Sequence, residues 1–182
     1  VTVTVDRGEL LKHVNFENHN ASISSLKADG SLREKDGRVF WDLPSGRSTL
    51  SYFVRIPHER NPGKYDALIN KDWAIFRGDD IVPAMHIDTG DVIGSYSIST
   101  LEFVLPKGWN SVKTGWPLVQ DNTFRIDNPE RRFDRPTGWM IAGKIGSRNT
   151  LRKGTSITVA APIGQNYQRM DALVFLRFVW RE

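Results

Sequence analysis

The stretch LSYFVRI at residues 50–56 is the clearest indication of the fold class, because apolar side chains occupy every second position: Leu50, Tyr52, Val54 and Ile56. Successive side chains of a β-strand point to opposite faces, so this pattern gives one apolar face and one polar face. The stretch therefore predicts a half-buried strand that packs one side against a core.

The same alternation returns near both ends of the chain. Val1, Val3 and Val5 share one face, as do Ile157, Val159, Ala161 and Ile163. Shorter candidate strands lie at residues 23–26, 39–43, 73–77, 124–126 and 139–145, and turn-forming Gly, Pro, Asp and Asn residues separate them. Many short strands and frequent turns predict a mainly β protein, either an antiparallel β-sandwich or a curved open sheet.

Composition limits the classes of partner. The net charge of +4 is the difference between 25 basic and 21 acidic residues and not the result of a basic tract, so nucleic acid is not an expected partner. No apolar run reaches the roughly 20 residues of a membrane span. The absence of cysteine excludes disulfides and thiolate metal ligands, and it fits the cytosol and the periplasm equally well.

The C-terminal segment has a different composition. Between residues 172 and 180 only Arg177 is polar, and residues 168–181 contain good helix formers without Gly or Pro. We predict one C-terminal helix, and a helix that is apolar on every face needs cover on every face. We therefore expect a β-rich domain at 1–166 and, at 167–182, an apolar helix whose natural cover is missing. A buried central strand is the alternative for this segment.

Residues that carry chemistry form no recognisable catalytic motif. His13, His19, His58 and His86 lack the spacing of a helical zinc site, and no Gly-x-Ser-x-Gly sequence occurs. We therefore assign no catalytic, cofactor-binding or metal-binding residue. An enzyme whose acidic residues meet only in the fold stays open as a further alternative.

The large aromatic residues support a rival hypothesis. They could form a sugar-stacking face of a free-standing carbohydrate- or ligand-binding β-sandwich, although such residues more often fill a core. The candidates are Trp41, Tyr52, Phe53, Trp73, Phe76, Trp109, Trp116 and Trp139.

Three strings resemble a known family. They are WAIFRGDDIVP at residues 73–83, DNPERRFDRPTGWMIAG at 127–143 and RMDALVFLR at 169–177. On the basis of these strings, most of the chain resembles the N-terminal region of bacterial zinc metallopeptidases of the glycyl aminopeptidase type. These enzymes are thermolysin-like gluzincins. The resemblance implies that residues 1–166 are a β-rich N-terminal domain and that residues 167–182 are the start of a catalytic domain. In that family a helix of the catalytic domain carries His-Glu-x-x-His and holds zinc.

The resemblance implies a supporting role for this chain, because none of those zinc ligands occurs in it. We expect a non-catalytic β-domain that packs on the catalytic domain of the same parent chain and shapes its substrate cleft, where a peptide substrate would lie. Arginine and aromatic residues are common anchors of such contacts. The predicted interdomain contacts are Arg77, Asp79 and Asp80, then Arg131, Arg132, Asp134 and Arg135 between two prolines, and finally Leu173, Phe175, Phe178 and Trp180.

Overall fold

A computed structural model describes residues 1–6, 11–18, 22–56, 59–61, 64–65, 67–88, 97–126 and 135–164. Within these ranges nearly all regular structure is strand, every strand pairing is antiparallel, and the single helix is the short α1 (Gly78–Ile81). The prediction of a mainly β, antiparallel protein is confirmed.

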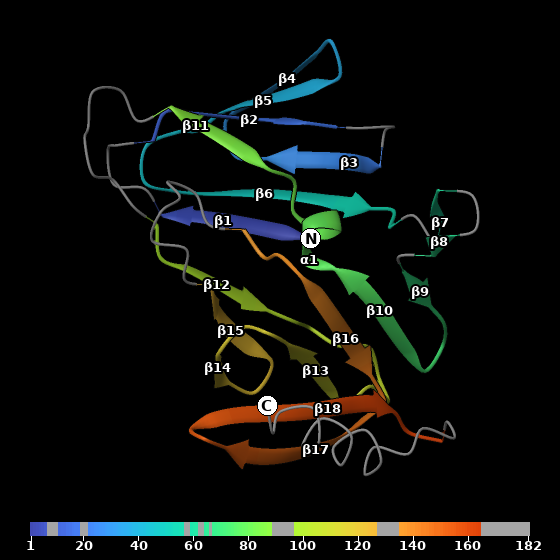
Figure 1. The fold of residues 1–182 in the computed structure, drawn as a ribbon. Coiled ribbons are helices and arrows are strands. Elements are labelled where there is room, and N and C mark those ends of the chain that lie inside the picture. Colours follow the sequence, from blue (N-terminus) through green and yellow to red (C-terminus); the bar gives the residue numbers. More distant parts are fainter. Residues whose placement is uncertain are drawn as a thin grey trace.

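Two sheets form a first sandwich, in the upper half of Figure 1. One has the order β1 (Thr2–Asp6), β6 (Arg47–Val54), β3 (Ile23–Ala28), and the other β11 (Met85–Asp88), β2 (His13–Glu17), β5 (Arg38–Asp42), β4 (Ser31–Lys35). Their side chains share one core, in which Trp41 and Phe16 of the second sheet are fully buried together with Leu50 of the first. The alternation predicted from the sequence directs Leu50 and Tyr52 into this core and leaves Phe53 exposed.

Two further sheets form a second sandwich, in the lower half of Figure 1. Their orders are β13 (Ser111–Thr114), β16 (Trp139–Gly143), β10 (Trp73–Arg77), β9 (Leu68–Ile69) and β12 (Ser99–Glu102), β15 (Thr123–Ile126), β14 (Leu118–Gln120). The core that they share contains Phe76, Phe124 and Met140. The fold therefore has two packed units, each with its own apolar cluster.

Two hairpins complete the described strands. The short pair is β7 (Glu59–Asn61) and β8 (Lys64–Tyr65), and the long pair, β17 (Ile145–Arg152) and β18 (Thr155–Pro162), lies below the second sandwich in Figure 1. The long hairpin turns at Lys153 and Gly154, which both have positive φ. Two positive φ angles at the centre of a two-residue turn match the right-handed twist of the flanking strands.

The long hairpin is attached to the second sandwich at the end of β16. Lys144 donates its backbone N–H to the carbonyl of Asp72 at 2.8 Å, and its Nζ lies 2.6 Å from Asp72 Oδ1. Ile145 donates its N–H to the side-chain oxygen of Asn110 at 2.9 Å. The hydrogen bond from Lys144 also lowers the pKa of Asp72. These contacts fix the direction in which β17 leaves the sheet.

The strand predictions are confirmed with one correction. The segments at 50–56, 39–43, 73–77 and 124–126 correspond to β6, β5, β10 and β15. The segment at 139–145 is not one strand: β16 ends at Gly143 and β17 begins at Ile145, because Gly143 has a φ of 135° that an extended strand does not allow. The predicted C-terminal helix at 167–182 lies outside the described residues.

Tyr52 joins the two sandwiches. Its ring belongs to the first core and is 3% exposed, while its hydroxyl donates to the carbonyl of Ile81 at 2.9 Å. Ile81 ends helix α1 and packs against the second core. Burial raises the pKa of Tyr52, because the ionised phenolate would lose its hydration.

Replacement of Tyr52 by phenylalanine should lower the free energy of unfolding by about 1–3 kcal/mol, because the carbonyl of Ile81 loses its buried partner. The raised pKa keeps Tyr52 protonated in the folded chain, so its contribution is complete below a pH of about 10 and is lost as the pH rises further. Urea unfolding at neutral pH, and again between about pH 9 and about pH 11, tests both points. Equal alkaline slopes for the wild type and Tyr52→Phe would contradict the second.

Candidate functional site

The turn after β10 packs directly against the chain that enters β16. A Cβ atom on Gly78 would lie 2.7 Å from Met140 Cε and 2.9 Å from the carbonyl carbon of Pro136, so a larger residue does not fit there. Gly78 also donates its N–H to the carbonyl of Gly138 at 2.9 Å. The tight contact brings the side chains of both segments together.

Three charged side chains form a cluster at this contact, which we call the arginine cluster: Arg77, Asp79 and Arg135. The Nη2 atoms of Arg77 and Arg135 each lie 3.6 Å from a different oxygen of Asp79. Asp79 Oδ2 also accepts the N–H of Gly138 at 3.1 Å. Two guanidinium groups thus share one carboxylate, and all three side chains keep between 23% and 36% of their surface exposed.

Trp139 extends the arginine cluster outward. The guanidinium carbon of Arg77 lies 5.9 Å from the centre of the Trp139 ring, a cation–π contact, and Trp139 itself is 51% exposed. A half-exposed indole beside two arginines has the composition of a protein contact surface.

The structure brings together only part of the predicted contact set. Arg77, Asp79 and Arg135 meet, and Asp80 lies next to Asp79 on α1 and is partly buried. The other predicted residues lie outside the described part of the chain: Arg131, Arg132, Asp134, Leu173, Phe175, Phe178 and Trp180. The interdomain role of the set stays a prediction.

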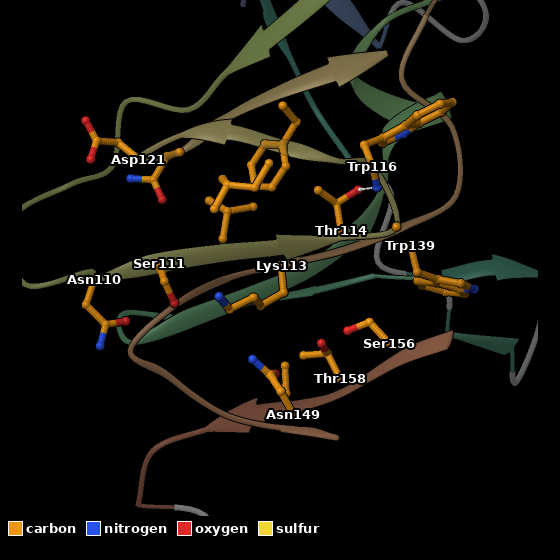
Figure 2. Close-up of a pocket in the computed structure, with 16 residues that line it drawn as sticks. Asn110, Ser111, Lys113, Thr114, Trp116, Asp121, Trp139, Asn149, Ser156 and Thr158 are labelled. Carbon is orange, nitrogen blue, oxygen red and sulfur yellow. Dashed lines mark hydrogen bonds between the residues drawn. The ribbon is translucent and has the colours of Figure 1, made fainter. Parts of the chain in front are cut away.

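A hollow of about 720 Å³ borders Trp139 and lies between β13, the β14–β15 turn and the long hairpin. Figure 2 shows Lys113 on the side of β13 that faces Asn149, Ser156 and Thr158 of the hairpin, with its side chain running along the strand toward Ser111. Trp116 and Trp139 lie at one end of the hollow and Asp121 near the other. Most of the lining side chains are polar. The remaining lining residues are Asn110, Ser111, Val112, Thr114, Gly115, Leu118, Asn122, Phe124 and Ala160.

Two polar groups in the hollow have no partner among the described residues. Ser111 Oγ is buried and makes no hydrogen bond, and Lys113 forms no ion pair with any carboxylate in the described ranges. A buried hydroxyl usually has a partner, and an ammonium group among neutral polar side chains favours an anionic one. The hollow is therefore better suited to a ligand with a carboxylate than to an apolar ligand.

The histidines and acids do not form a metal site in the part of the chain that the structure describes. His13 Nδ1 lies 2.7 Å from Asp42 Oδ1, and the hydrogen bonds from His13 and Ser31 lower the pKa of Asp42. No group of three or more His, Asp or Glu side chains within the described ranges could hold a metal ion. His19 and His58 lie outside those ranges.

No helix in the described residues is long and apolar enough to cross a membrane.

Sequence reasoning missed the hollow. The segment SVKT of β13 has one apolar residue, so it carries too little alternation to predict a strand. Ser111, Lys113, Ser156 and Thr158 are common surface residue types, and no motif singled them out. These residues come together only because β13 pairs with β16 in a fixed register and because β18 pairs with β17 in the long hairpin.

The fold is similar to part of a much larger protein. A crystal structure of an aminopeptidase N family protein from Idiomarina loihiensis superposes with a TM-score of 0.65 at 15% sequence identity. The match covers 96% of this chain and 31% of that chain. At this identity the similarity establishes the fold alone. No family model matches the sequence, and no curated protein matches it.

Proposed function

We propose that the chain is the non-catalytic N-terminal β-domain of a zinc-metallopeptidase-like protein, and that it packs on the catalytic domain and shapes one wall of the substrate cleft. The supporting observation is the extent of the structural match: nearly the whole chain corresponds to less than a third of an aminopeptidase N family protein. A β-domain of this size would leave the larger part of such a protein to carry zinc and perform the chemistry.

The arginine cluster and Trp139 are the described surface that suits such packing. Arg77 and Arg135 share the carboxylate of Asp79, so each retains donors for a carboxylate or carbonyl of a partner domain. Trp139 adds half-exposed apolar area next to them. Because the turn at Gly78 fits tightly against Pro136, the cluster is positioned before any partner arrives.

The coding region after Glu182 gives the first test. A helix with His-Glu-x-x-His in the following residues would support the proposal, and a stop codon directly after Glu182 would reject it. This test does not depend on the folding of any variant.

Charge removal in the arginine cluster gives the second test. With the 182-residue chain and the remainder of the parent chain produced separately, Arg135→Gln should weaken their association at least about tenfold, which corresponds to about 1.4 kcal/mol. Calorimetric titration measures this effect. Arg33→Gln is the matched control, because Arg33 is an exposed arginine on β4 that likewise lies near an aspartate, Asp42 at 3.8 Å. Equal weakening by both variants would contradict the assigned contact surface.

The rival carbohydrate-binding function has less support from the aromatic residues. It requires two or three solvent-facing Trp or Tyr rings on one concave face. Trp41 and Tyr52 are instead buried in the first core, and three more Trp side chains are partly buried: Trp73, Trp109 and Trp116. Among the Trp and Tyr side chains that the structure describes, only Trp139 is exposed.

A further inference from the structure

Strand β13 is an edge strand, and its free edge lies along the hollow. In the described part of the chain β13 pairs with β16 and with no other strand. All residues from Asn110 to Trp116 line the hollow, so it follows the strand along its whole length. In Figure 2 the strand crosses the middle of the hollow, between the β14–β15 turn and the hairpin.

A free strand edge presents backbone N–H and C=O groups that lack a neighbouring strand. Such an edge is a template for another extended chain, and proteins usually shorten, bend or cover it. The hollow leaves room beside β13, with residues of β14 and β15 in one wall and residues of β17 and β18 in the other. The shape therefore fits an extended peptide.

We propose that this hollow binds an extended peptide segment, which adds to β13 as a further strand of its sheet and places a carboxylate on Lys113. Backbone hydrogen bonds would supply affinity that depends little on sequence, and the side-chain contacts would supply selectivity. The proposal does not depend on the function proposed above, because it requires only this chain.

Charge complementarity selects a peptide with a carboxylate. Lys113 is partly buried and has no acidic partner among the described residues. It lies on the side of β13 that faces the hairpin, where Asn149, Ser156 and Thr158 line the hollow with neutral side chains. The acidic residue of the lining, Asp121, is near the far end of the hollow. An acidic side chain near the centre of the peptide would thus gain an ion pair in a recessed position, where salt screens it less than on an open surface.

Ser111 lies close to the position that we propose for the peptide carboxylate. Residues two apart on a strand share a face, so Ser111 and Lys113 lie on one side of β13, toward the hairpin in Figure 2. The Ser111 Oγ, which is buried and has no partner among the described residues, would donate to the peptide after a change of side-chain rotamer. Val112, between them, belongs to the second core and is 3% exposed.

Fluorescence anisotropy with the 182-residue chain tests the proposal. The probe is a fluorescein-labelled peptide of about seven residues, the length of an ordinary strand, with alternating Thr and Val around a central Glu. Saturable binding is expected, and replacement of the central Glu by Gln should weaken it about tenfold. Two further peptides, one N-methylated on its odd-numbered residues and the other on its even-numbered residues, test whether the backbone takes part in binding. Strand addition uses the N–H groups along one edge of the peptide, so at least one of the two peptides should lose binding.

Protein variants identify the site. Lys113→Gln should weaken binding of the Glu peptide about tenfold and remove the difference between the Glu and Gln peptides. Thr158→Glu, on the hairpin wall, should weaken binding of the Glu peptide by repulsion without altering β13. Lys107→Gln is the matched control, since Lys107 is an exposed lysine in a turn that does not line the hollow.

Several outcomes would overturn the proposal. They are the absence of saturable binding up to about 1 mM peptide, full binding by both N-methylated peptides, and equal effects of Lys113→Gln and Lys107→Gln. Binding of a soluble oligosaccharide such as chitohexaose in the same hollow, without binding of the peptide, would also reject it in favour of a sugar site.

Discussion

Replacement of Gly143 by alanine should destabilise the chain by about 2–6 kcal/mol, which is a large part of the roughly 5–15 kcal/mol that stabilises an ordinary domain. The expected loss has two sources. Gly143 has a φ of 135°, which residues with a Cβ rarely adopt. A Cβ atom at this position would also lie 2.4 Å from the carbonyl oxygen of Asp72 and 2.5 Å from the Cα of Trp73.

The neighbours of Gly143 cannot move aside easily, because they are backbone atoms at the start of the adjacent strand. Trp73 pairs with Gly143 across β10 and β16, and the carbonyl of Asp72 accepts the N–H of Lys144. Relief of the clash would therefore disturb the attachment of the long hairpin. The Gly143→Ala variant should lose the hollow together with stability, since the hairpin forms one of its walls.

Gly46→Ala separates the two sources of the effect. Gly46 also has a positive φ, of 83°, but a Cβ there would meet nothing within 4 Å. Gly46→Ala should therefore lower the free energy of unfolding by the backbone strain alone, about 1–2 kcal/mol. Urea unfolding followed by circular dichroism measures both variants. If Gly143→Ala and Gly46→Ala lowered the free energy of unfolding by similar amounts, the close contact of Gly143 with the start of β10 would not be important for stability.

Replacement of Trp41 by alanine should lower the free energy of unfolding by about 3–5 kcal/mol. Trp41 is 0% exposed and lies in the first core with Phe16 and Leu50. Its removal leaves a cavity between two paired sheets that can relax only in part. It also removes the 2.7 Å hydrogen bond from the indole N–H to the carbonyl of Asp29.

Trp109→Ala is the matched control for the Trp41 variant. Trp109 also donates its indole N–H to a backbone carbonyl, that of Lys71 at 3.0 Å, but it is only partly buried beside the second core. Its loss should cost less than about 2 kcal/mol, because less apolar surface returns to water. Differential scanning calorimetry compares the two variants, and an equal decrease in Tm would contradict the central position of Trp41.

The arginine cluster joins two segments of the predicted contact set that lie far apart in the sequence. The sequence places Arg77 and Asp79 at a turn after one predicted strand and Arg135 in a charged loop before another. Their contact depends on the pairing of β10 with β16, which sets Arg77 opposite Trp139. A pairing between strands so far apart in the chain is a tertiary property, so no local pattern predicts it.

The hollow could not be predicted from any local pattern. Its lining comes from six strands, β13 to β18, and from the turns beside them, and no single segment contributes a recognisable motif. The edge position of β13 follows from the order of strands in its sheet, which alternation along one segment cannot reveal.

Local chemistry along the chain was enough to predict the class of structure. Alternating apolar residues such as Leu50 and Tyr52 have one face that must leave water, and turn residues such as Asp36 and Gly37 accept the positive φ angles of a tight hairpin. These are requirements of neighbouring residues, so they can be recognised in the sequence. The division into two cores, the arginine cluster and the hollow required the folded structure, because each depends on which strands pair and in which register.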